Sequence, residues 1–312
     1  MALLAQILPI LLLLLAGVTL RVTQMLSDEA VEGLKTLVVT LVLPSVLFTV
    51  FLDVQFEPAY WGLFVLVAAI CVGLYVIGLG LGRLLAPGRP YFPFLFTGFE
   101  YGMLGMSLFG AAYGMEAVRY IAIVDLSHEL FIWFFFAPLL MILRDGDSRP
   151  GAVLKLFVTS PVVIGLVSGI VLGALGLAET VKTAPVLSSL YAAMSLAASM
   201  IVPLILIIVG YGIRLQREGL ADVLLLAVLR YALIVPAALI LNRVALDGWL
   251  GLSEPFQVAL FMLLILPSPF IIPIFMQRAS AADRAYVNNA LTVMTVISLV
   301  LFAIYLGLHP TL

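Results

Sequence analysis

Long apolar runs constrain this chain more than any other feature. Runs of about 20 residues recur from end to end, and each is long enough to cross the hydrocarbon core of a bilayer. Lipid offers no hydrogen-bond partners, so only helices and closed barrels span it. The runs are continuous and lack the alternation of barrel strands. The sequence therefore predicts an all-α polytopic membrane protein.

Composition supports this class and excludes others. Hydrophobic residues make up 64% of the 312 residues and charged residues only 10%, against about 25% in soluble domains. No segment is left for a soluble domain of useful size, a basic nucleic-acid-binding domain or a nucleotide-binding loop. We expect no cofactor and no metal. The single cysteine, Cys71, falls inside a span and is expected to pack as a small apolar residue.

The apolar runs define ten predicted spans joined by short connections. They are residues 3–20, 31–51, 60–84, 91–113, 118–142, 153–175, 190–213, 220–245, 254–277 and 284–308.

Lysine and arginine alternate between the two sets of loops with a strong bias. One set holds Arg21, Lys35, Arg83, Arg89, Arg144, Arg149, Lys155, Arg214, Arg217, Arg278 and Arg284. The other set, which includes both termini, holds Arg119, Lys182 and Arg243. The positive-inside rule then predicts a cell-membrane protein with the first set in the cytoplasm and both termini outside.

The cytoplasmic segment 144–152 divides the chain into two halves, 1–143 and 153–312, with five predicted spans each. An odd number per half means that the second half crosses the membrane upside down relative to the first. Inverted repeats of this kind are typical of secondary transporters. Each half has a proline in its second span, at Pro44 and Pro203.

The fourth span of each half contains helix-breaking residues near its middle. In the first half these are Gly98, Gly102 and Gly105, and in the second they are Pro267, Pro269 and Pro273. Unwound backbone at that depth survives only against protein or a watery cavity. If the two breaks meet, half-helix N-termini and freed carbonyls converge on one point and form a substrate site. The alternatives are small-residue packing for the glycines and a simple kink for the prolines.

Among the Asp, Glu, His, Lys and Arg residues, five lie deep inside predicted spans, more than five positions from either end: Glu100, Asp125, His128, Glu129 and Arg230. Spacings of three and four place the middle three on one helical face. Charges at such depth usually mark ion pathways or internal pairs. We hypothesise that Glu100 takes up a coupling proton and that His128 relays it. The alternatives are a structural hydrogen-bond anchor at Glu100, an internal salt-bridge cluster, and a charge-partner role for Arg230.

Four motifs in order resemble the auxin efflux carrier family, which includes plant PIN proteins and bacterial carriers of small organic acids. They are "LVLPSVLF", "YGMLGMSLFGAAYG", "IVPLILIIVG" and "LPSPFIIPIFMQR". The resemblance implies a fold related to sodium/proton antiporters and bile acid symporters, in which two broken helices cross between a scaffold domain and a transport domain. By position, the expected substrate-binding residues at the crossing are Gly98, Glu100, Tyr101, Gly102, Gly105, Pro267, Ser268, Pro269 and Pro273.

Three positions depart from the family pattern. Family members usually carry Asn at Glu100 and Pro at Ser107, and an Asn is often found where this chain is apolar around Ile271. A neutral amide suits a carboxylate ligand. An ionised Glu100 would repel one unless it is protonated or paired.

These observations predict a secondary carrier of a small organic anion that works by alternating access, with the proton as one candidate coupling ion. The alternatives are a sodium-coupled symporter or exchanger on the same fold and a non-transporting membrane sensor. Neither H-E-x-x-H nor a nucleophile elbow is present, so an enzyme is not expected. The expected partners are the anion, the coupling ion and the lipid bilayer. Carriers of this architecture often form dimers, so a homodimer is one expectation for the assembly.

Overall fold

The structure, a computed structural model, describes residues 2–146, 150–214 and 219–312, and these ranges contain helices and no strands. The α-helices, in chain order, are α1 (Ala2–Val22), α2 (Asp28–Leu37), α3 (Leu43–Leu52), α4 (Ala59–Leu85), α5 (Phe92–Phe96), α6 (Met106–Tyr113), α7 (Val118–Phe131), α8 (Ala137–Asp145), α9 (Pro150–Thr159), α10 (Pro161–Ala174), α11 (Ala178–Thr183), α12 (Pro185–Ser199), α13 (Ile201–Gly212), α14 (Leu220–Leu241), α15 (Glu254–Leu264) and α16 (Ala281–Leu308). Short π-helical or 3-10 turns accompany them: η1 (Val38–Val42), η2 (Tyr101–Gly105), η3 (Met115–Ala117), η4 (Ile132–Phe136), η5 (Asn242–Trp249) and η6 (Ile272–Phe275).

Six continuous helical segments of the described chain are long and apolar enough to cross a membrane. They are Asp28–Leu52, Ala59–Leu85, Met115–Asp145, Pro185–Gly212, Leu220–Trp249 and Ala281–Leu308. The predicted helical membrane class is therefore confirmed. Of the other four predicted spans, 3–20 corresponds to α1, of which Gln6–Val22 is counted among the shorter apolar helices, and three correspond to interrupted helices: α5 with α6, α9 with α10, and α15 with η6.

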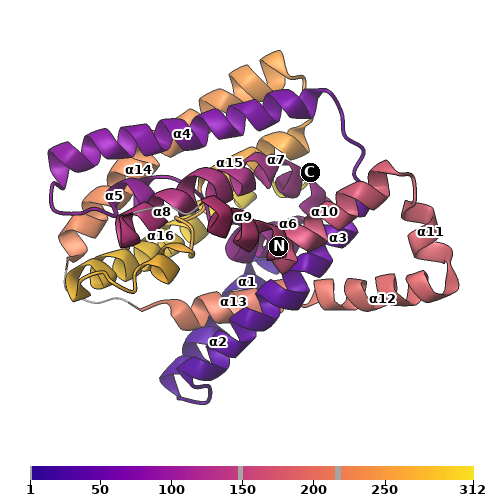
Figure 1. The fold of residues 1–312 in the computed structure, drawn as a ribbon, viewed down its shortest axis with the longest axis horizontal. Coiled ribbons are helices and arrows are strands. Elements are labelled where there is room, and N and C mark those ends of the chain that lie inside the picture. Colours follow the sequence, from indigo (N-terminus) through magenta and orange to yellow (C-terminus); the bar gives the residue numbers. More distant parts are fainter. Residues whose placement is uncertain (1, 147–149, 215–218) are drawn as a thin grey trace.

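The helices pack in two groups (Figure 1). In the first group, α10 and α12 pack on α3, and α13 packs on α1. In the second group, α4 packs on α5 and α7, α15 packs on α7 and α14, and α16 packs on α14. The helix α6 contacts members of both groups. In Figure 1 the helices α3, α10 and α12 of the first group lie to the right, whereas α5 lies to the left and α4 runs along the top from the left edge.

Glycines allow the helices of the first group to approach backbone to backbone. A Cβ atom at Gly165 of α10 would lie 2.4 Å from the Pro44 carbonyl oxygen of α3. A Cβ atom at Gly210 of α13 would lie 2.1 Å from the Leu14 carbonyl oxygen of α1, and Gly17 makes the reciprocal approach to α13. Close packing through small residues is the usual way in which membrane helices associate, because lipid supplies no hydrophobic driving force between them.

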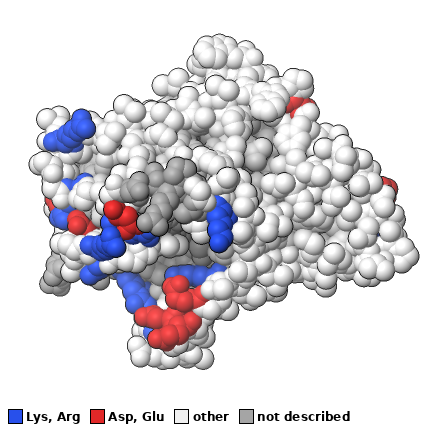
Figure 2. All heavy atoms as spheres, viewed as in Figure 1, with Lys and Arg blue, Asp and Glu red and all other residues white. Residues whose placement is uncertain are grey.

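Several arginines of the loops that are predicted to face the cytoplasm form ion pairs with acidic residues that are distant in the sequence. Arg89 pairs with Asp222 at 2.7 Å, Arg278 pairs with Asp145 at 3.2 Å, and Arg214 pairs with Asp28. These ion pairs join loops that alternate along the chain, so they support the grouping of the loops on one side. In Figure 2 most of the visible charged side chains lie over the left and lower part of the molecule. Arg149, Arg217 and positions 147–149 of the predicted linker lie outside the described residues.

The opposite end carries the smaller set of cations. Lys182 pairs with Asp53 at 2.5 Å, and the partly exposed ion pair raises the pKa of Lys182. The Gln6 side chain donates to the Pro310 carbonyl at 3.0 Å, so segments near both ends of the chain lie together. This proximity agrees with the predicted even number of crossings. Which end faces the cytoplasm stays a prediction of the positive-inside rule.

The close packing of α1 on α13 predicts that alanine in place of glycine destabilises the fold at this contact and not at an open glycine position. Gly210→Ala places a methyl group against backbone that cannot move away by rotation of a side chain, so it should destabilise the fold by about 1–3 kcal/mol. Gly73→Ala on α4 is the matched control, because its Cβ would meet nothing within 4 Å. Thermal unfolding in detergent should show a lower Tm for Gly210→Ala and an unchanged or higher Tm for Gly73→Ala. Equal Tm values would contradict the packing.

Candidate functional site

The first interruption separates α5 from η2. The helix α5 ends at Phe96, Thr97 is extended, and Gly98 has a φ of +68°. A Cβ atom at Gly98 would also lie 2.7 Å from Cγ of Pro269. Glycine is therefore favoured here for two reasons, the left-handed backbone and the close approach of the second interrupted segment. Helical structure resumes at Tyr101.

The second interruption follows α15, which ends at Leu264. Residues 265–271 are non-helical, and η6 then supplies only a short 3-10 turn. Pro267 and Pro269 account for the break, because each lacks an N–H donor and its ring clashes with the preceding turn. Both prolines are buried. The unwound backbone is thus enclosed by protein, as membrane depth requires.

The two interruptions meet. The Glu100 N–H donates to the carbonyl oxygen of Pro267 at 2.8 Å, although the two residues are far apart in the sequence. The predicted facing of the two breaks is therefore present in the structure. Simple small-residue packing of Gly98 and a simple proline kink do not describe this arrangement.

The Glu100 carboxylate binds main-chain N–H groups from both interrupted segments. Its Oε1 accepts from the Met103 N–H at 3.1 Å, and its Oε2 accepts from the Phe270 N–H at 2.5 Å. The side chain is buried, with 8% of the residue exposed. Both oxygens accept, which is the pattern of an ionised carboxylate. Glu100 therefore supplies negative charge where unpaired N–H groups carry partial positive charge.

Arg230 of α14 donates hydrogen bonds to main-chain carbonyl groups at the same crossing. One terminal nitrogen, Nη1, donates to the Leu95 carbonyl at 2.8 Å and to the Ser268 hydroxyl at 3.1 Å. The other, Nη2, donates to the carbonyls of Gly98 at 2.7 Å and Leu266 at 3.2 Å. Arg230 is 0% exposed. It thus satisfies carbonyls that both helix breaks leave without helical partners.

The partners of Arg230 correct one sequence-based interpretation. We expected a buried carboxylate as its charge partner. Among the described residues, no carboxylate lies within 4 Å of its guanidinium, and main-chain carbonyls take that role. The guanidinium carbon also lies 5.3 Å from the ring centroid of Phe99, a cation–π contact.

His128 connects α7 to the first interruption. The Phe99 N–H donates to His128 Nε2 at 2.9 Å. A main-chain N–H can only donate, so Nε2 is unprotonated and the neutral ring carries its proton on Nδ1. That Nδ1–H donates to Asp125 Oδ1 at 2.7 Å. In this conformation His128 is an acceptor that positions Phe99, and a second proton on the ring would displace this contact.

Glu129 and Asp125 line a narrow cavity of about 30 Å³ together with Tyr101 and Gly102. Apolar side chains of α3, α6, α7 and α10 complete it. The cavity therefore lies between the two helix groups, directly beside the crossing. Glu129 also accepts from the Trp133 indole at 2.7 Å, and the buried Tyr101 hydroxyl has no hydrogen-bond partner.

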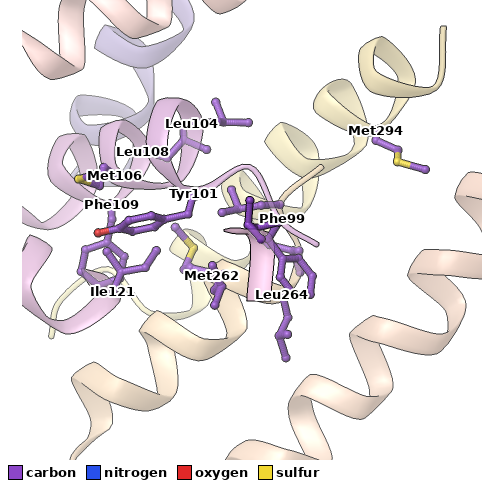
Figure 3. Packing of buried hydrophobic residues seen from close by; sticks show 14 of the residues in the cluster. Phe99, Tyr101, Leu104, Met106, Leu108, Phe109, Ile121, Met262, Leu264 and Met294 are labelled. Atoms are coloured by element: carbon purple, nitrogen blue, oxygen red, sulfur yellow. The ribbon is translucent and has the colours of Figure 1, made fainter. Parts of the chain in front are cut away.

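The Tyr101 ring projects away from the break into an apolar environment. Figure 3 shows it among the side chains of Met106, Phe109 and Ile121 on α6 and α7. Phe99 lies on the other side of Glu100 and packs against the ring of His128 at 5.5 Å between centroids. The residues on either side of Glu100 thus anchor the break in the core.

Of the remaining predicted residues, Gly105 and Ser268 contact the crossing, whereas the other three are prolines that lie in helical segments. Gly105 lies against the second break, since its Cβ would be 2.7 Å from Leu266 Cδ1, and Ser268 donates to the Leu95 carbonyl. Pro273 lies in η6 and is exposed. Pro44 and Pro203 belong to α3 and α13, and the backbone of Pro44 lies against Gly165 of α10.

Two larger cavities flank Arg119 near the end that holds Gln6 and Lys182. One, of about 430 Å³, is lined by residues that include Gln6, Tyr113 and Pro310. The other, of about 470 Å³, is lined by polar residues of α3 and α12. Both mix polar and apolar lining, and none of the described residues that line them belongs to the two interruptions.

The sequence did not reveal the N–H donors of the site. Phe270 and Met103 contribute only main-chain groups, so their side chains gave no signal. The position of Phe270 directly after Pro269 is the feature that could have indicated a freed N–H group.

A scan of known protein-family models finds no match to this chain, and a search of curated protein sequences finds no similar protein. The resemblance to auxin efflux carriers therefore stays a prediction from the sequence motifs.

The role of His128 predicts a particular tautomer. The chain has two histidines, so selective ¹⁵N-histidine labelling should give signals from only two rings, and His309→Asn removes one of them. The remaining ring at neutral pH should be neutral with its proton on Nδ1. An Nε2-protonated ring or an imidazolium would contradict the Phe99 contact.

Proposed function

We propose that this chain is a secondary active carrier that moves a small organic anion across a cell membrane by alternating access, with protons as the coupling ion. The observation that carries the proposal is the pair of N–H groups, from Met103 and Phe270, that converge on one buried carboxylate. Discontinuous helices with N-termini pointing at anionic groups are a recurring form of transporter binding site.

In the structure, the Glu100 carboxylate occupies the position that this geometry stabilises. A free substrate carboxylate could use the same two N–H groups only after Glu100 leaves them. Protonation would release Glu100, because a carboxylic acid presents a donor where the ionised form presents an acceptor. Uptake of a proton and binding of an anion would then be linked at one position.

The carboxylates of Asp125 and Glu129 add to this linkage. They line the cavity beside the crossing, and an anion that entered it would meet their negative charge. Protonation or pairing of these groups would remove the repulsion. The charge of Asp125 and Glu129 would therefore affect how tightly an anion binds, whereas Glu100 is the group whose protonation is linked to anion binding.

Ten spans in two inverted halves, 1–143 and 153–312, are part of the proposal. The packing of the first helix group supports the inverted repeat. The first helix of each half packs on the second helix of the other half, and glycines at the contact allow the two backbones to approach closely. These contacts are α1 on α13 and α10 on α3. The first group would serve as the scaffold, and the second group, which carries the crossing, would shift against it.

The resemblance to the auxin efflux carrier family agrees with this arrangement of a scaffold and a crossing. Family carriers of organic acids usually have Asn where this chain has Glu100. The substitution puts a titratable group at the crossing, and we propose that it is the group that couples anion transport to protons here.

Transport by Glu100→Gln tests the proposal. A thermal-shift screen of small carboxylates, amino acids and indole acids first selects a substrate, whose uptake is then measured in proteoliposomes. The glutamine amide of this variant cannot release a proton, so uptake should lose its dependence on an imposed pH gradient while counterflow exchange continues. Glu29→Gln, at an exposed position in the first turn of α2, is the matched control and should keep the dependence.

Two results would contradict the proposal. Full pH-gradient dependence in Glu100→Gln would mean that another group couples transport to protons. Ligand binding without counterflow in the parent protein would identify a membrane sensor and not a carrier.

A further inference from the structure

Arg230 has the surroundings of a bound metal cation. Three main-chain carbonyl oxygens, from Leu95, Gly98 and Leu266, and one hydroxyl oxygen, from Ser268, converge on its guanidinium. In transporters with broken helices, unwound carbonyls and half-helix C-terminal ends are the groups that coordinate sodium. Oxygen ligands without a neighbouring thiol or imidazole are those that hard cations prefer.

The charge of Arg230 is stabilised by these dipoles and not by an ion pair. Its guanidinium is fully buried, and no carboxylate of the described chain lies within 4 Å of it. Arginine does not lose its proton in proteins. The carbonyl side of the crossing is therefore filled by a permanent positive charge.

Because the guanidinium is covalently attached to α14, the positive charge can move only with that helix. Arg230 lies within α14 of the second helix group, and the carbonyls that it binds belong to the segments around α5 and α15 of the same group. The charge and its ligands would therefore travel together if the second group moves against the first. A diffusible ion at this position would have to be bound and released in each cycle.

We propose that Arg230 is the resident cation of the crossing: it fills the position that a coupling sodium ion takes in other broken-helix carriers, so this carrier works without sodium. The inference rests on the proposed carrier function and decides between its two candidate coupling ions. It also assigns Arg230 a role in specificity, since removal of the guanidinium should open a carbonyl-lined site to small external cations.

The first test measures uptake by the parent protein. Proteoliposomes with an imposed pH gradient receive the selected carboxylate in sodium chloride or in N-methyl-D-glucamine chloride. Equal uptake in the two salts is the expected result. Uptake that requires sodium would overturn the inference.

The second test needs no transport. The Tm of the parent, Arg230→Ala and Arg89→Ala is measured in detergent with sodium chloride, guanidinium chloride at millimolar concentration, or N-methyl-D-glucamine chloride. Arg230→Ala should be destabilised and should regain several degrees in sodium or guanidinium. The parent should not respond, and neither should Arg89→Ala, which loses an ion pair with Asp222 and a cation–π contact with Tyr286. An Arg230→Ala protein that does not respond to either small cation would overturn the inference.

A second pair of variants covers the case in which Arg230→Ala does not fold. Arg230→Lys keeps a positive charge, whereas Arg230→Met has similar length and none. Recovery of folded Arg230→Lys in higher yield than Arg230→Met supports the inference, and equal recovery overturns it. Absence of uptake by the parent in every salt would refute the carrier function and leave these stability results intact.

Discussion

The structure depends on one constraint: backbone groups that leave a helix inside a membrane need partners from the protein itself. Two helices of this chain are interrupted, at residues 97–100 and 265–271, and each interruption supplies hydrogen-bond partners for the other. Glu100 and Pro267 join them directly through the main chain. The side chain of Glu100 then accepts from two further N–H groups, and that of Arg230 donates to three carbonyls.

These two side chains divide the crossing by charge. Glu100 collects N–H donors from both broken segments, and Arg230 collects carbonyl acceptors from both. Each charge lies at the helix ends whose partial charge is opposite to its own. The two side chains stabilise the break in the absence of substrate, and any ligand that binds the N–H groups must first replace Glu100.

The sequence predicted the features that residue type controls. Continuous apolar runs indicated the helices, Gly98 and the prolines indicated the interruptions, and the depth of Glu100 singled it out. The contacts of Arg230 were not predictable, because its partners are main-chain carbonyls that every residue has. The different directions of His128 and Glu129 were also hidden, since spacings of three and four predict a shared face and not which groups each side chain meets.

The most direct measurement of the crossing is a disulfide between the two interrupted segments. A Cβ atom at Gly105 would lie 2.7 Å from the Leu266 side chain, so Gly105→Cys with Leu266→Cys in a Cys71→Ala background should cross-link on oxidation in native membranes. Ala111→Cys with Leu266→Cys is the control, because position 111 lies more than a helical turn further along α6. We expect a disulfide in the first pair alone. Failure of that pair to cross-link, or equal cross-linking of both pairs, would contradict the account.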